Sequence, residues 1–424
     1  MASKMEPLPG TSDIWEPEVS EWVRLETAAR ETFRRYGYGE LRTPVFERTD
    51  VFVRSIGDET EVVQKEMYTF EDRGGRSLTL RPEGTAGTMR AIANQGLAQG
   101  EEKRVFCIGP MFRGERPAAG RKRQFHQISV EAVGKCSPAL DAEVIQMLAR
   151  YLEEIGLTQI NIQINSRGTR EDRDTIAPQL QGYFREHAAA MCEDCQRRVE
   201  TNVWRILDCK NAECQPIIEQ SPPIPELLGE ESRAYFEQVC GLLDALEIRY
   251  NVNPRLVRGL DYYEHTVFEI TSDAEGLGAQ NALAGGGRYQ INLPASKTPV
   301  QGVGFGIGME RLLLALHPEH FEERGTGKID VFVAGRGAET QPQRMLLAQQ
   351  LRDAGIAAIC EHEGRSLKAQ FRTANRLDAH LVLVLAEEEI AKKTVSCKDM
   401  RSSEQEECPQ DKIVEWVTGR LTTA

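Results

Sequence analysis

The segment of residues 104–134 carries the side chains best suited to chemistry, because a dense group of arginines lies between two predicted strands. From residue 101 to residue 125 the chain has seven basic and three acidic residues, a local charge of +4 in a chain of −13. Guanidinium groups match the geometry of phosphate oxygens, so Arg113 at a strand end beside a basic loop suits a polyphosphate and a nucleic-acid end. For the loop alone, an ordinary solvated hairpin remains the alternative.

The second of these strands, predicted over residues 124–133, presents one polar and one apolar face. Successive side chains of a strand point to opposite sides. The apolar face holds His126, Ile128, Val130 and Ala132, and the polar face holds Phe125, Gln127, Ser129 and Glu131. An antiparallel pair can use one face for the core and the other for a site. Gln127 and Glu131 on one face therefore favour a binding site.

Length and composition predict a globular protein of roughly two or three domains. The chain has 424 residues, of which 40% are hydrophobic and 28% charged. No run of about 18 apolar residues could span a bilayer, and the amino terminus lacks the apolar stretch of a secretion signal. The ten cysteines are unevenly spaced, which is typical of reduced thiols in the cytoplasm. The acidic net charge argues against nucleic-acid binding through net charge, but it allows a local basic footprint.

The first 95 residues predict a helix, an extended run, and then a hairpin that leads into a second helix. Helical spacing covers residues 19–36, and the extended run that follows contains Pro44, which marks a sheet edge or an interface. Thr85 is the predicted cap of the second helix, with the backbone amides near Gly84 and Thr85 open to a ligand. Glu83 at this junction could cap the helix or hold an ammonium group.

A polar helical insertion is predicted at residues 167–233, after a helix over residues 138–155 and a short strand. It contains four cysteines, Cys192, Cys195, Cys209 and Cys214. The first pair has the spacing of metal ligands, whereas four residues separate the second pair. A zinc site and a group of buried thiols are both open interpretations.

The chain then returns to strands that carry arginine, tyrosine and glycine. Arg258 precedes a glycine, Tyr262 and Tyr263 follow, and glycines 285–287 permit close backbone approach to a ligand. A strand of residues 300–308 runs into a helix with Arg311 in its first turn. An arginine there opposes the helix dipole, so an anionic partner is expected. The alternating glycines of this strand lack the final step of a dinucleotide loop.

A separate small α/β domain is predicted after a polar boundary at residues 317–328. The order of its elements is βαβαββα, ending in a helix over residues 411–421. Two of its strands are apolar enough for a sheet that is covered on both faces.

These segments together resemble the bacterial-type histidyl-tRNA synthetases, which are class II aminoacyl-tRNA synthetases. The resemblance runs from end to end, and LVRGLDYY at residues 256–263 is its most diagnostic motif. The other matching pieces are the extended run around Pro44, LRPEGTAG, FRGERPAAGRKRQFHQ, the rest of LVRGLDYYEHTVFE, AGGGRY and GFGIGMERL.

The resemblance implies an α+β fold, in which helices flank the antiparallel sheet of class II synthetases. The catalytic domain would be formed by residues 1–166 and 234–325, interrupted by a helical insertion at residues 167–233. Residues 328–424 would form an α/β anticodon-binding domain. The segment around Pro44 would form a homodimer interface.

The resemblance also implies roles for site residues. ATP, accompanied by Mg²⁺, would be held by Arg113, Arg258 and Arg311, with Arg258 and Arg113 as the catalytic residues. The tRNA acceptor end would contact Arg116, Arg121 and Arg123. Histidine would be held by Glu83, Gly84, Thr85, Gln127, Glu131, Tyr262 and Tyr263.

The implied activity is ATP-dependent ligation of L-histidine to tRNA(His) through a histidyl-adenylate, which releases AMP and pyrophosphate. One alternative is a histidine-sensing regulatory subunit of ATP phosphoribosyltransferase, which lacks the carboxy-terminal domain and commonly loses catalytic arginines. Another is an ATP-dependent ligase acting on a free amino acid, which needs no anticodon domain. The chain departs from the family in two places. Gln290 stands where an acid usually follows GGRY, and the segment from there to residue 298 is unusual. The cysteine-bearing insertion is the second place.

Overall fold

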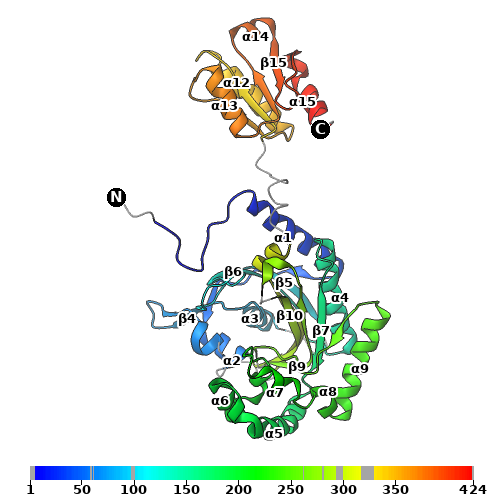
Figure 1. Ribbon diagram of the computed structural model, residues 1–424. Coiled ribbons are helices and arrows are strands. Elements are labelled where there is room, and N and C mark those ends of the chain that lie inside the picture. Colours follow the sequence, from blue (N-terminus) through cyan, green and yellow to red (C-terminus); the bar gives the residue numbers. More distant parts are fainter. Residues whose placement is uncertain are drawn as a thin grey trace. The chain divides into compact units, whose positions relative to one another are not determined.

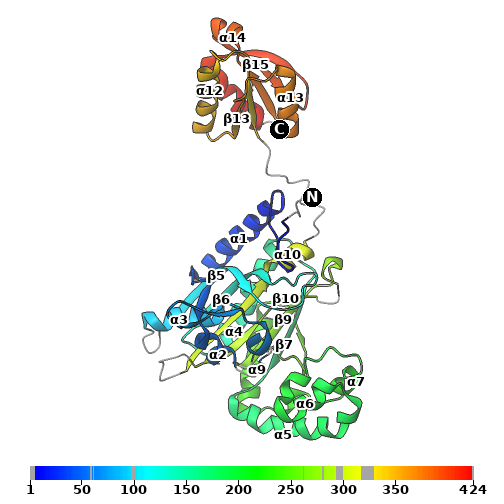
Figure 2. The ribbon, with the colours of Figure 1, turned by 90° about the vertical axis from the view of Figure 1, so that its left-hand side faces the viewer.

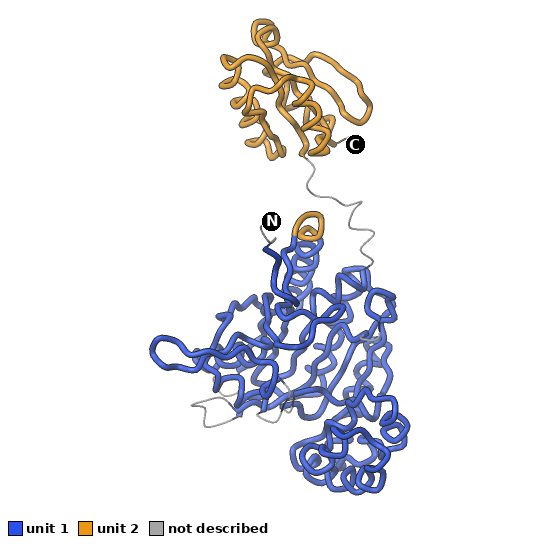
Figure 3. The backbone as a smooth tube through the Cα atoms, turned by 60° about the vertical axis from the view of Figure 1, so that its left-hand side comes forward, with its two compact units in different colours: residues 1–14, 21–320 blue, residues 15–20, 321–424 orange. Residues whose placement is uncertain are grey.

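The computed structural model describes residues 5–57, 60, 62–96, 101–260, 262–278, 281–292, 299–316 and 329–422. The chain divides into two compact units, coloured separately in Figure 3: residues 1–14 with 21–320, and residues 15–20 with 321–424. The predicted boundary at residues 317–328 lies outside the described residues.

An eight-stranded sheet forms the centre of the first unit (Figure 1). Its strand order is β1-β5-β6-β11-β10-β9-β7-β8, and the pairs from β5 to β7 are antiparallel. Only the edge pairs β1·β5 and β7·β8 are parallel among the described strands of this sheet. The strands are β1 (Gly39–Glu40), β5 (Lys103–Phe112), β6 (Gln124–Val133), β7 (Asn161–Ser166), β8 (Asn251–Val252), β9 (Tyr263–Thr271), β10 (Ala282–Ile291) and β11 (Val300–Gly308). The predicted antiparallel core of an α+β fold is confirmed.

Helices α1 (Glu18–Arg35), α4 (Pro138–Glu154) and α9 (Glu230–Ala245) pack on this sheet. Phe33 of α1 lies 5.4 Å from Phe106 and 5.5 Å from Tyr151, measured between ring centroids. A buried ion pair between Arg288 and Asp141 joins β10 to α4, with 2.9 Å between Nε and Oδ1. The apolar faces of the central strands therefore form the core together with these helices.

The register of the central strands builds a different surface on the other face. Directly opposite residues of paired strands lie on the same side. Glu131 of β6 is opposite Gly304 of β11, which is opposite Gly287 of β10. Gly302, Gly306 and Gly308 occupy the same face of β11 as Gly304. The alternating glycines thus leave a surface without side chains on β11, beside the polar residues of β6. This role explains the glycine spacing that resembles a dinucleotide loop.

A smaller sheet of order β2-β4-β3 precedes the central one in the chain. The predicted hairpin is confirmed by β3 (Thr69–Glu71) and β4 (Ser77–Leu80), and β2 (Phe46–Arg48) pairs on the other side of β4. Around it lie α2 (Thr49–Ile56), the π-helical turn η1 (Val62–Glu66) and α3 (Thr85–Gln95). Helix α3 contacts β6, so its first turn reaches the polar face of the central sheet.

The predicted helical insertion forms a cluster with its own apolar core (Figure 2). Its buried residues include Phe184, Val199 and Trp204, and Val257 from the segment before β9 joins the same core. Its elements are α5 (Arg170–His187), η2 (Ala188–Ala190), α6 (Glu193–Thr201), η3 (Val203–Ile206), α7 (Gln215–Glu219) and α8 (Ile224–Leu227). Further along the chain, η4 (Glu275–Leu277) precedes β10, and α10 (Met309–Ala315) follows β11.

The second unit contains a five-stranded sheet of order β13-β12-β14-β15-β16. Its strands are β12 (Val331–Ala334), β13 (Ala358–Cys360), β14 (Leu381–Val384), β15 (Thr394–Asp399) and β16 (Gln405–Pro409). Its helices are α12 (Gln341–Asp353), α13 (Leu367–Arg376), α14 (Glu387–Lys392) and α15 (Ile413–Thr422). The 3-10 turn η5 (Gln410–Lys412) precedes α15. The predicted order of elements is incomplete, because it omits α14 and β16. Strand β16 is a polar edge strand, so its sequence lacks an apolar alternation. Across the described residues, no helix combines the length and the apolar character needed to cross a bilayer.

Candidate active site

One cavity of the first unit collects most of the predicted site residues. Its walls come from β6, β10 and β11, the residues that follow β4 and β5, the start of α3, and the segment that leads into β9. The predicted residues that line it are Glu83, Thr85, Arg113, Gln127, Glu131, Arg258, Tyr262 and Tyr263. We call it the Glu131 cavity. Chain segments separated by more than 100 residues thus present two carboxylates and two guanidinium groups to one space.

The start of α3 is held by Glu83, so the predicted cap at Thr85 is wrong. The Glu83 carboxylate accepts hydrogen bonds from the backbone N–H groups of Thr85 (2.7 Å) and Ala86 (2.8 Å). Gly84 is the cap residue, and a Cβ there would lie 2.2 Å from Ser129 Oγ, so glycine permits this approach to β6. The Thr85 hydroxyl is free to point into the cavity, where it donates to Glu131 Oε1 over 2.7 Å.

Glu131 is buried and receives a hydrogen bond on each carboxylate oxygen. Thr85 donates to Oε1, and the Tyr289 hydroxyl donates to Oε2, also over 2.7 Å. Burial raises the pKa of Glu131 to about 8, although both hydrogen bonds oppose this shift. Burial also raises the pKa of the neighbouring Glu83. Two buried carboxyl groups in one cavity suit a cation, because a bound ammonium group would favour their ionised forms.

Tyr289 is a cavity residue that the sequence interpretation does not single out. Its hydroxyl lies over β11, since a Cβ at Gly302 would come within 2.5 Å of it. A usable signal does exist, because strand alternation places Tyr289 on the same face as Gly285 and Gly287. Ser129, Leu260, Phe305 and the glycines 304 and 306 also line the cavity without having been predicted as site residues, and so does Gly285, which was predicted to allow close approach of a ligand.

Arg258 enters the cavity beside Glu269 of β9, with which it forms an ion pair. A Cβ at Gly285 would lie 2.2 Å from Arg258 Nη2, so the glycine of β10 makes room for this guanidinium. Glycines 285–287 were predicted to allow close approach of a ligand. At Gly285 the group that approaches is the Arg258 side chain of the protein itself. Glu269 is a further residue that the sequence interpretation misses.

Arg113 and Arg311 have different surroundings. Arg113 lines the Glu131 cavity, donates from Nε to the carbonyl of Pro82 (2.9 Å), and lies over the Phe125 ring. Arg311 is not among the residues that line this cavity, and its guanidinium donates to the carbonyl oxygens of Gly120 and Ala282. Burial lowers the pKa of Arg311, and the nearby Arg121 adds to this effect. An anion bound beside Arg311 would offset both effects.

The three arginines predicted for a nucleic-acid end lie on the loop between β5 and β6, where their surroundings differ. Arg116 and Arg121 are exposed, and Arg121 lies 3.5 Å from the Glu115 carboxylate. Arg123 instead donates to the backbone carbonyl oxygens of Glu115 (3.4 Å) and Pro9 (3.5 Å), which ties the amino-terminal segment to the loop. Arg116 and Arg121 are thus the better placed of the three for an external partner.

Gln290, where the chain departs from the family pattern, lies beside a second, arginine-rich cavity. Its carboxamide oxygen accepts a hydrogen bond from Gln301 Nε2 over 3.0 Å. Tyr262 lines both cavities, and the second one also includes Arg54, Arg167, Arg170 and Arg173. Residues 293–298, the rest of the unusual segment, lie outside the described residues.

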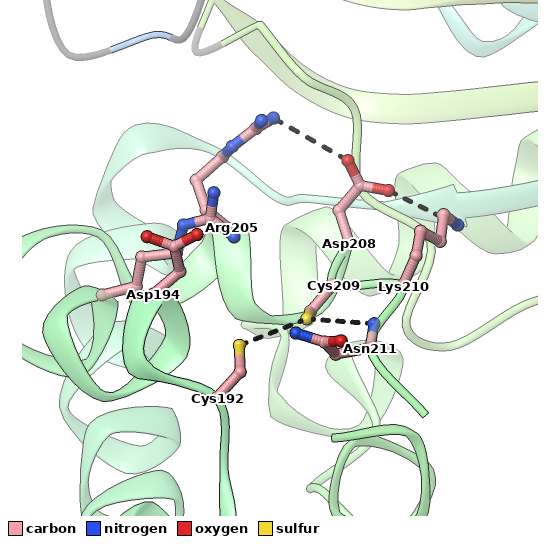
Figure 4. Close-up of a pocket in the computed structure, with 8 residues that line it drawn as sticks. Cys192, Asp194, Arg205, Asp208, Cys209, Lys210 and Asn211 are labelled. Atoms are coloured by element: carbon pink, nitrogen blue, oxygen red, sulfur yellow. Dashed lines mark hydrogen bonds and ion pairs between the residues drawn. The ribbon is translucent and has the colours of Figure 1, made fainter. Parts of the chain in front are cut away.

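The four cysteines of the insertion lie together. Their sulfur atoms are all within 4.8 Å of one another, and three of the four residues are buried. Figure 4 shows Cys192 and Cys209 facing each other beside Arg205, Asp208 and Lys210. The unequal spacing of the two pairs in the sequence therefore does not keep them apart in the fold.

Comparisons with known proteins find two family models that match different parts of the chain. The family model described as histidyl-tRNA synthetase matches residues 10–171 and 196–312, and the model described as anticodon binding domain matches residues 328–420. The histidine–tRNA ligase of Geobacillus sp. (strain WCH70) is 45% identical over 418 residues, covering 97% of this chain and 98% of the relative. That of Bacillus subtilis (strain 168) is 43% identical over 412 residues, 96% of each chain.

Solved structures are similar over nearly the whole length. Apo histidyl-tRNA synthetase from S. aureus matches with a TM-score of 0.79 and 36% identity, covering 97% of this chain and 100% of that one. An ATP phosphoribosyltransferase regulatory subunit/histidyl-tRNA synthetase from Bacillus halodurans C matches with a TM-score of 0.64 and 20% identity, covering 90% and 98% of the two chains, which shows the fold alone. On the family match, the identities and the coverage, the chain belongs to the histidyl-tRNA synthetase family.

Proposed function

We propose that this chain ligates L-histidine to its cognate tRNA, activating histidine with ATP in the Glu131 cavity and then transferring the histidyl group to the tRNA. The observation that carries the assignment to this cavity is the meeting of Glu83 and Glu131 with Arg113 and Arg258 in one space. Carboxylates suit the ammonium group of an amino acid. Guanidinium groups suit its carboxylate and the phosphates of ATP.

Histidine would bind with its ammonium group toward the two carboxylates. Glu131 is buried and would be neutral in the empty cavity below a pH of about 8. A bound cation would favour its ionised form. The imidazole would contact the polar side chains of the cavity, Gln127, Tyr262 and Tyr263. A pocket that hydrogen-bonds both ring nitrogens rejects apolar analogues strongly, because their binding leaves its buried polar groups unpaired.

The activation step joins two anions that repel each other. Arg258 would lie against the histidine carboxylate and the α-phosphate, where negative charge grows as the carboxylate oxygen displaces pyrophosphate. Arg113 and Arg311 would hold the remaining phosphates, and Mg²⁺ would arrive as part of the MgATP substrate. Gly285 supports this role for Arg258, since the missing side chain lets the guanidinium lie directly over β10.

The transfer step needs a tRNA, and two regions support that partner. The exposed Arg116 and Arg121 lie on the basic loop after β5, beyond Arg113. Residues 328–420 match an anticodon-binding domain, which would read single-stranded bases by edge contacts and stacking. We assign the reaction to the cytoplasm, and the ten cysteines, none of which forms a disulfide in the described part of the chain, support this assignment.

We also propose that the enzyme is a homodimer that pairs through the face of the β2-β4-β3 sheet. Phe46 is opposite Leu80 and Phe70 is opposite Leu78, so four apolar side chains share one face. Phe46 is 49% exposed and Phe70 is 45% exposed. The opposite face carries hydroxyl groups, among them Thr69 and Thr79, whose oxygens are 2.9 Å apart. An apolar face of this kind, next to Pro44, suits a second copy of the chain.

The regulatory and free-ligase alternatives have less support. A regulatory subunit needs neither an anticodon-binding domain nor catalytic arginines, yet this chain has both a matching domain and arginines lining the cavity. Charging of total tRNA with each amino acid in turn separates the three. We expect histidine alone to be incorporated. Histidine-dependent pyrophosphate exchange without any charging would favour the free ligase, and histidine binding without exchange would favour the regulator.

A further inference from the structure

The sulfur atoms of Cys192, Cys195, Cys209 and Cys214 have the arrangement of ligands around one metal ion. The Sγ atoms of Cys192 and Cys209 are 3.9 Å apart, and every pair among the four is within 4.8 Å. A tetrahedron of thiolates around Zn²⁺ with bonds of about 2.3 Å has edges of about 3.8 Å. The thiols therefore need only a small contraction to take one ion. An iron–sulfur cluster, with sulfide bridges between its irons, would hold the thiolates farther apart.

The local backbone supports this use of the thiols. Cys192 is the cap residue of α6 and Cys195 lies in the first turn of that helix, while Cys214 immediately precedes α7. The backbone N–H of Cys192 points at Cys214 Sγ over 3.3 Å, and that of Asn211 at Cys209 Sγ over 3.4 Å. Such N–H···S contacts stabilise negative charge on sulfur, so two loops already present donors to the atoms that would become thiolates.

The charge around the thiols is also suitable. Four thiolates with one Zn²⁺ carry a net negative charge, which requires cations nearby. Arg198, Arg205 and Lys210 line the pocket next to Cys192 and Cys209 (Figure 4). Asp194 lines the same pocket, and Asp208 lies 3.9 Å from Arg205 Nη1 and 3.6 Å from Lys210 Nζ, so two carboxylates offset part of this positive charge.

From these contacts we propose that Cys192, Cys195, Cys209 and Cys214 bind one structural Zn²⁺, which fastens the start of α6 to the segment between η3 and α7. The ion replaces the thiol protons, which pass to solvent. All four positions are taken by protein, so the site is closed and has no open coordination position for a substrate.

This zinc site would stabilise the part of the insertion that supports the Glu131 cavity. Cys195, Cys209 and Cys214 belong to the same buried core as Val257, which directly precedes Arg258. Arg205, on the cysteine-bearing segment, lies against Gly259, the residue that follows Arg258. A Cβ at Gly259 would be 3.1 Å from Arg205 Nη1. Removal of the ion is therefore expected to lower the melting temperature of the first unit.

Elemental analysis of the purified full chain, expressed without a metal-binding tag in zinc-supplemented medium, tests the proposal. We expect one zinc per chain, released when a mercurial reagent blocks the thiols. The Cys192→Ser and Cys209→Ser variants should lose the zinc and melt at a lower temperature. Cys240→Ser, which removes a partly buried thiol outside the cluster, should keep both properties of the wild type.

The wild-type protein alone can overturn the proposal, so the outcome does not depend on the variants folding. Stoichiometric iron in place of zinc, or no metal together with no uptake of added Zn²⁺ or Co²⁺ by the reduced protein, would refute the site. Bound Co²⁺ should give the absorption of tetrahedral thiolate coordination. Full zinc content in a folded Cys209→Ser variant would equally contradict it.

Discussion

The hydroxyl of Tyr289 donates a hydrogen bond to Oε2 of Glu131 over 2.7 Å, and the two side chains meet above the glycines of β11. Tyr289 comes from β10 and Glu131 from β6, with β11 between them. A side chain at Gly304 would occupy this space, because its Cβ would lie 2.1 Å from Glu131 Oε2. The glycine spacing of β11 thus allows a tyrosine two strands away from Glu131 to donate a hydrogen bond to this carboxylate.

Replacing Tyr289 by phenylalanine should weaken histidine binding. The hydrogen bond stabilises the ionised carboxylate, so its loss raises the pKa of Glu131 further and leaves less carboxylate to bind a cation. Hydrogen bonds to charged groups contribute about 1.5–3 kcal/mol, which corresponds to a KM for histidine roughly 10- to 150-fold higher at neutral pH. The difference in KM between the variant and the wild type should become smaller as the pH rises. Steady-state pyrophosphate exchange between pH 7 and pH 9 measures both effects.

Tyr235→Phe is the matched control, because its hydroxyl also donates to a carboxylate, that of Asp141 over 3.0 Å, but outside the Glu131 cavity. Its KM for histidine should stay close to the wild-type value. An equal rise in KM for both variants would show that the effect is not specific to Glu131.

Glu131→Gln should stabilise the ligand-free protein increasingly as the pH rises. The pKa of Glu131 is about 8 in the folded chain and near 4.5 when unperturbed. The folded state therefore retains a proton that the unfolded state loses, and this term lowers the free energy of unfolding as the pH rises from about 4.5 to 8. The glutamine variant lacks this term, so its advantage should grow by on the order of 3 kcal/mol between pH 5 and pH 8.

Denaturant unfolding at several pH values measures this difference. Glu153→Gln removes a negative charge from an exposed helical position and serves as the control. A stability difference for Glu131→Gln that stays constant with pH would contradict the raised pKa. The same variant should bind histidine weakly, so the two measurements together separate stability from recognition.

Phe70→Asp should convert the dimer to monomers, because it places a charge on the apolar face that Phe46, Leu78 and Leu80 share. Sedimentation equilibrium of the 47.6-kDa chain distinguishes the two states. Val23→Asp adds a charge at another exposed apolar position, on α1, and should leave the dimer intact. A monomeric wild type, or a dimeric Phe70→Asp variant, would contradict this interface.

The alternation of polar and apolar residues predicted the polar face of β6, because the opposite face must be apolar to pack in the core. It did not predict which hydrogen bonds form there. Whether Glu83 or Thr85 caps α3 depends on how close β6 approaches, and that distance is a property of the packed sheet. Pairing of Arg258 with Glu269 likewise requires the register of β9 and β10. Contacts between distant segments are therefore the part that the sequence alone leaves open.

Histidine-dependent exchange of pyrophosphate into ATP, measured for Arg258→Ala, tests the central claim most directly. Arg255→Ala removes a guanidinium from the same segment and is the control, since Arg255 bonds to the carbonyl of Ser221 over 2.6 Å and does not line the Glu131 cavity. A fixed charge at such a centre contributes about 2.7–4 kcal/mol, so exchange by Arg258→Ala should fall by about 10²- to 10³-fold in a folded protein. Arg255→Ala should stay within a few-fold of the wild type. Exchange by Arg258→Ala at the wild-type rate would contradict the placement of the reaction in this cavity.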